Sequence, residues 1–433
     1  MRYAGLAEAA WTWVLRQVRW DDAGPWIPEA AGGEKPEEYR DGMHSGIGGL
    51  AHALAEIRLA RPWTADEQKL AGAIADRIRA AVPAERSVTY FDGLVGSIGV
   101  LTALGEPGAA QAVERVTELA TADGWPESFL QAPKYRPGAV ANDATLGTGA
   151  VLMGALWAAR QGLDARSLIE RAANHLMAEQ EASGNWLFVS RRFCTGEPGQ
   201  MPNFSHGLAG IAAVLAPAGV ELGRPDLVDA ARRGAERLVT LGINDDEGFR
   251  VPRVIPWDKR QGDEYTHNWC HGGAGTSLLF RALEYAGVDQ VAGETPAVWH
   301  RRCLDSVRHS GVPDRRYPGF WDNDGRCCGT AGAGDVFLDA CLRDGHDDDL
   351  DFAVRLGNAL VQRAFHDDGT AYWRFVEHRD DDPLLPPGIG WMQGAAGIAA
   401  YLFRLQRVLD GDTGSVERMD NWWALSGARP RRW

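Results

Sequence analysis

A short glycine pattern recurs seven times along this chain and constrains its fold more than any other feature. Each copy has the form Gly-x-x-small and opens an apolar run. Successive copies lie 47 to 65 residues apart, which leaves room for two helices and two loops in each interval. The first glycines of the seven copies are Gly46, Gly93, Gly147, Gly207, Gly272, Gly329 and Gly394.

Two kinds of helix alternate in these intervals. The runs that open at the glycines are apolar nearly all round, which is typical of buried helices. The segments between them carry charges on one face and apolar residues at i, i+3, i+4 spacing, as surface helices do. These segments lie near residues 5–19, 65–82, 109–122, 165–179, 225–240, 293–309 and 349–365.

Seven outer and seven inner helices predict an all-α fold, a closed (α/α)7 toroid or barrel with two helix layers. The N-termini of the inner helices would share one rim, so we expect functional residues just before the glycines. We predict one barrel domain over residues 1–412. A C-terminal tail, residues 413–433, either packs on the barrel or stays loose.

Composition limits the classes of function. The chain has 433 residues, 45% hydrophobic and 24% charged, as a globular protein does. Its formal net charge of −14 argues against nucleic acid as the main partner. No run approaches the roughly 18 apolar residues of a membrane span, and residues 1–18 resemble an amphipathic helix rather than a signal peptide. We therefore expect no membrane span and a cytoplasmic protein, whose cysteines stay reduced.

Three cysteines stand directly before repeat glycines. Cys270 lies two residues before the fifth glycine, and Cys327 and Cys328 precede the sixth. Isolated cysteines are often inert core residues. Three at neighbouring rim positions instead predict a zinc site with an open fourth position, which is typical of catalytic zinc. His271 competes for a ligand place, and we favour a hydrogen-bonding role for it.

His206 and Asp143 are the candidate catalytic residues. His206 precedes the fourth glycine, and Asp143 lies four residues before the third. Each has a structural alternative, since His206 could cap an inner helix and Asp143 could be an N-cap. As a catalytic pair, His206 would move a proton and Asp143 would orient it. His44 and His267, near the same rim, are assigned to structure or substrate contact.

Three motifs together resemble the lanthionine synthetase C (LanC-like) family: Trp269-Cys270-His271-Gly272, Cys327-Cys328-Gly329 and Ser205-His206-Gly207. The resemblance implies a zinc-dependent cyclase that adds peptide cysteine thiols to dehydroalanine or dehydrobutyrine, forming lanthionine or methyllanthionine rings. It implies Cys270, Cys327 and Cys328 as zinc ligands, with His206 and Asp143 in the active site.

The same resemblance implies two partners and marks two departures. The substrate would be a dehydrated precursor peptide. A separate dehydratase would supply it, because the repeats use up this chain. The family's usual histidine ligand is replaced by Cys328. An arginine that some members carry shortly before the Trp-Cys pair is also missing, and Thr266 and His267 stand there.

Three other functions remain open at this point. A relative could join a small thiol such as glutathione to dehydroamino acids, or only bind it, through the same zinc site. An α/α-barrel carbohydrate enzyme is suggested by the tryptophans, which often form sugar platforms. It would need two opposed carboxylates, for which Asp92 and Asp143 are available, and it would leave the three rim cysteines unexplained. The third is a scaffold without catalysis for a biosynthetic complex, which stoichiometric bound zinc would argue against.

Overall fold

Helices form almost all of the regular structure. The computed structural model describes residues 2–36, 38–258, 262–314, 323–376, 384–425 and 427–428. The odd-numbered helices are α1 (Arg2–Gln17), α3 (Ala65–Ala81), α5 (Ala109–Glu118), α7 (Arg166–Ala178), α9 (Pro225–Leu241), α11 (Pro296–His309) and α13 (Asp347–Arg363). The even-numbered helices are α2 (Leu50–Ala60), α4 (Leu94–Leu104), α6 (Thr148–Arg160), α8 (Leu208–Leu222), α10 (Gly273–Tyr285), α12 (Thr330–Asp344) and α14 (Ala395–Leu409). All of the helices predicted from the sequence are therefore confirmed, and each even-numbered helix begins within four residues of its repeat glycine.

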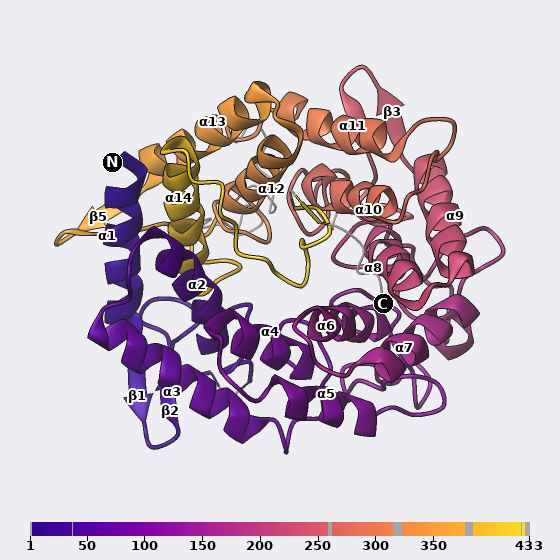
Figure 1. The fold of residues 1–433 in the computed structure, drawn as a ribbon, viewed down its shortest axis with the longest axis horizontal. Coiled ribbons are helices and arrows are strands. Elements are labelled where there is room, and N and C mark those ends of the chain that lie inside the picture. Colours follow the sequence, from indigo (N-terminus) through magenta and orange to yellow (C-terminus); the bar gives the residue numbers. More distant parts are fainter. Residues whose placement is uncertain are drawn as a thin grey trace. The chain divides into compact units, whose positions relative to one another are not determined.

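The chain divides into two compact units. The first contains Met1–Ala84, Gly99–Ala109 and Gly311–Glu417, and the second contains Glu85–Ile98, Ala110–Ser310 and Arg418–Trp433. In the first unit, α14 packs against α1, α2 and α12, and α12 packs against α13 (Figure 1). In the second, α8 lies between α6 and α10, and each of these three helices packs on the odd-numbered helix that follows it. The extent of a single domain over residues 1–412 stays a prediction.

Burial explains the two kinds of helix. In α9 the buried residues are Leu227, Ala230, Ala231, Gly234, Ala235 and Leu238, which form one stripe at helical spacing. In α8, by contrast, 13 residues are buried, so that helix has almost no solvent face. Among the described residues, no helix is both long and apolar enough to cross a membrane.

The repeat glycines are required by close backbone contacts. A Cβ atom on Gly207 would lie 1.6 Å from the carbonyl oxygen of Met201, six residues earlier, and one on Gly210 would lie 1.9 Å from that of Phe204. Gly207 also has φ of 146°, a conformation that L side chains rarely adopt. The loop before the helix therefore folds back onto the first turn, and only glycine leaves room for it.

This folded-back loop also satisfies the start of the helix. The amide of Leu208 donates to the carbonyl of Met201 at 3.0 Å. Equivalent bonds, each reaching back seven residues, join Thr148 to Ala141 at 2.8 Å and Thr330 to Asn323 at 2.9 Å. Backbone amides that a helix normally leaves unpaired at its start are therefore bonded within the repeat.

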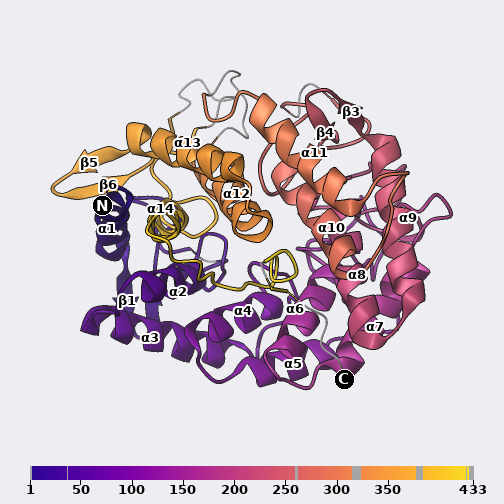
Figure 2. The same cartoon turned by 45° about the horizontal axis from the view of Figure 1, so that its top comes forward.

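In the described part of the chain, three short hairpins, which the sequence did not predict, follow odd-numbered helices. They are β1 (Arg19–Asp21) with β2 (Gly24–Trp26) after α1, β3 (Ile243–Asp245) with β4 (Gly248–Arg250) after α9, and β5 (Phe365–Asp367) with β6 (Thr370–Tyr372) after α13. All three pairs are antiparallel. Figure 2 shows the β5–β6 hairpin projecting beside α1, with which β6 is in contact.

Several tryptophans close the ends of odd-numbered helices. The indole N–H groups of Trp125, Trp186 and Trp373 donate to main-chain carbonyls near the ends of α5, α7 and α13, at 2.7–2.9 Å. All three indoles are buried. These residues therefore serve the core and the helix ends rather than a sugar-binding surface.

The described part of the tail packs on the second unit. Trp422 and Trp423 are buried, and the indole of Trp423 donates to the carbonyl of Leu278 in α10 at 3.1 Å. The Arg160 guanidinium lies 4.8 Å from the centre of the Trp422 ring. This part of the tail is therefore packed rather than loose, while Arg429–Arg432 lie outside the described residues.

Candidate functional site

The three predicted ligand cysteines are buried and close together. Cys270, Cys327 and Cys328 have exposed fractions of 2%, 8% and 2%. Their sulfur atoms lie within 4.8 Å of one another, and no other described residues form a group of three or more potential metal ligands. Three sulfur atoms bound to one zinc at about 2.3 Å would lie about 3.8 Å apart. All three are free thiols, so the residues fit a thiophilic metal such as zinc.

The loop before α10 holds Cys270. Asn268 Oδ1 accepts a hydrogen bond from the backbone amide of His271 at 3.0 Å and lies 3.3 Å from the Cys270 sulfur. The indole of Trp269 packs edge-on against the rings of Phe204 and Phe91. Side-chain packing and a capping amide therefore both fix the position of this cysteine.

The loop before α12 holds the other two cysteines, and the loop before α14 supports it. The amide of Cys327 donates to the carbonyl of Met392 at 2.8 Å. The Gln393 side-chain amide lies 3.2 Å from the Cys328 sulfur. The Arg326 guanidinium stacks 4.2 Å from the centre of the Trp391 ring. These three contacts thus anchor the consecutive residues Arg326, Cys327 and Cys328.

Asp143 and His206 lie against each other, as the sequence predicted. His206 Nδ1 is 3.3 Å from Asp143 Oδ2 and 3.2 Å from the hydroxyl of Thr145. Asp143 is fully buried, and its Oδ1 accepts from the amides of Thr145 and Leu146 and from the Thr145 hydroxyl. The N-cap interpretation of Asp143 is wrong, because Gly147 is the N-cap of α6 and no side chain caps that helix. Asp143 instead holds the turn before the helix and contacts the histidine, and its catalytic role stays a prediction.

These contacts select one tautomer of His206. The Thr145 hydroxyl has acceptors in Asp143 and in the carbonyl of Ser205, at 2.8 and 3.0 Å, so it can accept a hydrogen bond from His206. Nδ1 faces the Asp143 carboxylate and the Thr145 hydroxyl oxygen, both of which can accept, so it should carry a proton, which leaves Nε2 for chemistry. The His206 side chain is 28% exposed, enough for a reactant to reach it.

The histidine and cysteine loops are joined within the second unit. The amide of Ser205 donates to the carbonyl of Cys270 at 2.9 Å. The rings of His206 and His271 lie 5.4 Å apart between centres. The loop of the proton-transfer candidate His206 is thus hydrogen-bonded to the loop of the metal-ligand candidate Cys270.

The comparisons with known proteins agree with this arrangement. The model of the family described as lanthionine synthetase C-like protein matches residues 37–410, which is most of the chain. This chain belongs to the lanthionine synthetase C-like family. No curated protein matches it.

Two solved structures are similar to this family member. Nisin cyclase is 13% identical, with a TM-score of 0.59 and 93% of each chain covered. Unsaturated glucuronyl hydrolase from Bacillus sp. GL1 is 14% identical over 99% of this chain and 98% of its own, with a TM-score of 0.47. The likeness to nisin cyclase confirms the predicted fold class, an all-α α/α toroid.

The other rim histidines of this family member have defined surroundings. Burial lowers the pKa of His271 well below its usual value, and the charges of His206 and Arg253 lower it further. Burial, with the charge of Arg250, lowers the pKa of His267 to about 4. His44 has a partner that the sequence did not predict, the Ser45 hydroxyl at 2.9 Å. His271 does not belong to the cysteine group, and its role as a hydrogen-bonding residue stays a prediction.

Three residues near the site were not assigned a role from the sequence. Thr145 and Gln393 occupy the rim positions just before repeat glycines, and this shared position is the signal that could have identified them. Arg253 follows β4, and its charge is felt by His271. This family member therefore does have a guanidinium close to the site, although not where the family pattern has its arginine.

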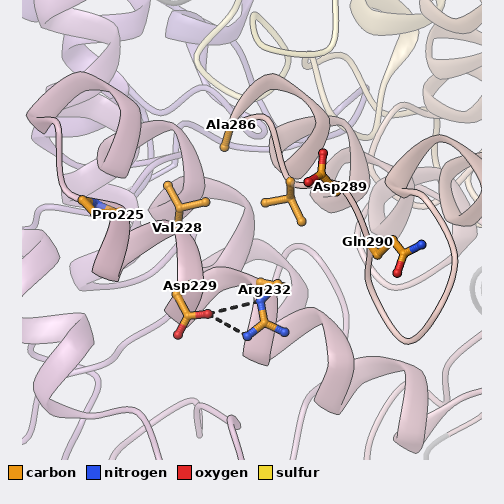
Figure 3. A pocket seen from close by; sticks show the side chains of 8 residues that line it. Pro225, Val228, Asp229, Arg232, Ala286, Asp289 and Gln290 are labelled. Carbon is orange, nitrogen blue, oxygen red and sulfur yellow. Dashed lines mark hydrogen bonds and ion pairs between the residues drawn. The ribbon is translucent and has the colours of Figure 1, made fainter.

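A surface pocket lies elsewhere on the second unit (Figure 3). It has a volume of about 450 Å³ and is formed by α9 and the segment after α10. An ion pair between Asp229 and Arg232 runs along its α9 side, at 2.7 Å. The lining segment Ala286–Gln290 begins where α10 ends, whereas Cys270 precedes its start. The length of α10, about 20 Å at 1.5 Å per residue, separates this pocket from the cysteine.

Proposed function

We propose that this protein is a zinc-dependent cyclase that closes lanthionine or methyllanthionine rings in a dehydrated peptide. The observation that carries the proposal is the buried group of three thiols, Cys270, Cys327 and Cys328. Membership of the lanthionine synthetase C-like family supports it. Nisin cyclase, which shares the fold, carries the cyclase activity in its name.

The three cysteines would hold the zinc ion and leave its fourth position open. Bound there, zinc would supply a Lewis acid that lowers the pKa of an incoming cysteine thiol, so that the thiol can lose its proton to a base and act as a nucleophilic thiolate. An all-thiolate ligand set is electron-rich, which suits attack on a soft alkene carbon. The role of the chain is to fix the three sulfur atoms and to keep water away from them through burial.

His206 would transfer the proton of the reaction from the thiol to the carbon skeleton. Addition to a dehydroamino acid produces an enolate, whose α-carbon must gain a proton. With Nδ1–H directed to Asp143 and Thr145, His206 can accept the thiol proton at Nε2 and deliver it to that carbon. Asp143 would stabilise the imidazolium that forms in between. One proton is taken up and one is returned, so the ring product has the mass of the substrate.

The neighbouring charges suit the enolate. His271 is neutral at pH 7, since its pKa is lowered, and does not compete for the transferred proton. The Arg253 guanidinium, whose charge reaches His271, would favour a developing oxyanion. We assign to Arg253 the place of the arginine that the family pattern has before its Trp-Cys pair.

The test is an incubation of the zinc-loaded protein with a synthetic peptide that contains one dehydroalanine and one cysteine. Ring closure leaves the peptide mass unchanged and removes one thiol from subsequent alkylation by N-ethylmaleimide. With glutathione present, a product heavier by one glutathione would instead identify small-thiol addition. A peptide that keeps its thiol and its mass under all conditions would overturn the proposal.

A carbohydrate enzyme and a scaffold without catalysis are less well supported than a cyclase. A glycosidase needs two carboxyl groups that face a sugar, but Asp143 is fully buried and committed to backbone amides and His206. A scaffold does not require a metal, so one bound zinc per chain would argue against it. The dehydrated peptide would come from a separate dehydratase. Reduced thiol ligands suit the cytoplasm.

A further inference from the structure

The loop of the seventh repeat has the same form as the loop that carries Cys270. Trp391-Met392-Gln393-Gly394 corresponds position by position to Trp269-Cys270-His271-Gly272. Gln393 therefore stands in the column that holds His206, His271 and Cys328 in the three preceding repeats. The mechanism above leaves this residue without a role.

Gln393 makes one polar contact that bears on the metal site. Its Nε2 lies 3.2 Å from the sulfur of Cys328, across 65 residues of sequence. The amide of the adjacent Cys327 donates to the carbonyl of Met392. Gln393 Oε1 is buried and has no hydrogen-bond partner among the described residues. Both cysteines of the sixth repeat are thus held by two consecutive residues of the seventh.

The chemistry of this contact gives the sulfur the role of acceptor. A carboxamide nitrogen donates hydrogen bonds and accepts none, so the sulfur must accept. Three thiolates around a divalent ion leave a net charge of −1, one unit more negative than two thiolates and a neutral imidazole. A donor at one sulfur withdraws part of that charge. The contact of Cys270 with Asn268 is different, since the side-chain atom that lies 3.3 Å from that sulfur is an acceptor, Asn268 Oδ1.

We propose that Gln393 is a positioning residue that donates a hydrogen bond to the Cys328 thiolate and so supports the third thiolate ligand. This inference rests on the proposed metal site and goes beyond it, because it assigns a partner to the residue that replaces the family histidine. Outer hydrogen bonds of this kind typically change metal affinity 10- to 100-fold. Gln393 therefore compensates for the change from histidine to cysteine.

The test compares Gln393→Met and Gln393→Glu with the wild-type full-length protein. Zinc affinity is measured by competition with a chromophoric chelator, and the ligand electronics by the sulfur-to-metal charge-transfer band of the cobalt(II)-loaded protein. Methionine matches glutamine in size but offers no donor. We expect about 10- to 100-fold weaker zinc binding and a band at lower energy, because the sulfur lone pairs rise when the donor is lost. Glutamate places an oxygen near the sulfur, so we expect an even larger loss of affinity.

Gln68→Met provides the matched control. Gln68 is exposed on α3 in the same unit, and its side chain reaches only the carbonyl of Trp63 at 3.4 Å. We expect neither affinity nor band to change in that variant. An unmoved band and unchanged zinc affinity in Gln393→Met would overturn the inference. Wild-type zinc affinity in Gln393→Glu would also overturn the inference, since it would mean that the side-chain oxygen of Gln393, not its nitrogen, faces the sulfur.

These outcomes are distinct from those of the proposed function. A wild-type protein that binds one cobalt ion with the expected band but closes no ring would retain the role of Gln393 and overturn the cyclase activity. Ring closure at the wild-type rate by a Gln393→Met protein with unchanged zinc affinity would retain the cyclase activity and overturn the role of Gln393.

Discussion

Replacement of Asp143 by asparagine isolates its role toward His206. Asparagine keeps an oxygen for the amides of Thr145 and Leu146, but it puts an amide nitrogen where Oδ2 lies 3.3 Å from Nδ1. That nitrogen is a hydrogen-bond donor, so Nδ1 would have to accept and the neutral His206 ring would carry its proton on Nε2. Nε2 is the atom that must accept the thiol proton. The negative charge beside the imidazolium is lost in the same change.

The size of the effect follows from the distance. Two unit charges 3.3 Å apart interact by about 5 kcal/mol at an effective dielectric constant of about 20. This value is an upper bound, because His206 is 28% exposed and solvent screens the pair. The bound corresponds to nearly 10⁴-fold in rate, which agrees with the 10²- to 10⁴-fold typical of general acid–base catalysis. We therefore expect Asp143→Asn to close rings at least about 10²-fold more slowly.

The assay is the single-turnover rate of ring closure, followed by loss of alkylatable thiol, with bound zinc and thermal stability measured in parallel. Asp226→Asn, an exposed change at the start of α9 in the same unit, is the matched control. A double variant with His206→Ala should lose little more than the slower single variant, because the two residues act as a unit. A folded, zinc-loaded Asp143→Asn protein that closes rings at the wild-type rate would refute the reasoning.

Three further predictions concern the metal, the pH dependence of stability and the repeat glycines. Cys270→Ala and Cys328→Ala should each lose most bound zinc, measured by elemental analysis; full retention in either variant would remove that cysteine from the ligand set. Burial raises the pKa of Glu127 to about 7 from its ordinary 4.5, so the folded state holds this proton longer than the unfolded state and stability should fall as pH rises from about 4.5 to 7. Glu127→Gln should abolish that loss, roughly 3 kcal/mol, in urea unfolding compared at pH 5 and pH 8; an unchanged pH dependence would contradict it. Gly207→Ala should destabilise the fold by more than about 3 kcal/mol, because its Cβ would meet a carbonyl oxygen at 1.6 Å, whereas Gly72→Ala on α3, with nothing within 4 Å, should be neutral or stabilising.

The helices could be predicted because two periodic signals agree. In α9 the apolar residues fall on one face, and in α8 they fall on all faces, so the sequence alone separates the surface helix from the buried one. The hairpins could not be predicted in this way. Each of their strands has three residues, too few for an alternating pattern to stand out, and their register depends on the helices they contact.

The site was predictable in its positions but not in its contacts. Asp143 and His206 were assigned as a pair, and the structure brings them together. Thr145 completes the pair through a contact that spans 61 residues, and Gln393 reaches Cys328 across 65. Such contacts depend on how neighbouring repeats are packed, which a single sequence does not reveal without covarying relatives.

The construction of the repeat explains why the donor at one position can vary while the fold persists. In the sixth repeat, a Cβ on Gly329 would lie 2.0 Å from the carbonyl of Asn323, and one on Gly332 would lie 1.8 Å from that of Arg326. These contacts join backbone to backbone and involve no side chain from the position between them, where Cys328 stands. The side chain there can therefore change from histidine to cysteine without rebuilding the loop. The change makes the ligand set one unit more negative. A hydrogen-bond donor beside the new thiolate offsets part of that charge, which is the role assigned to Gln393.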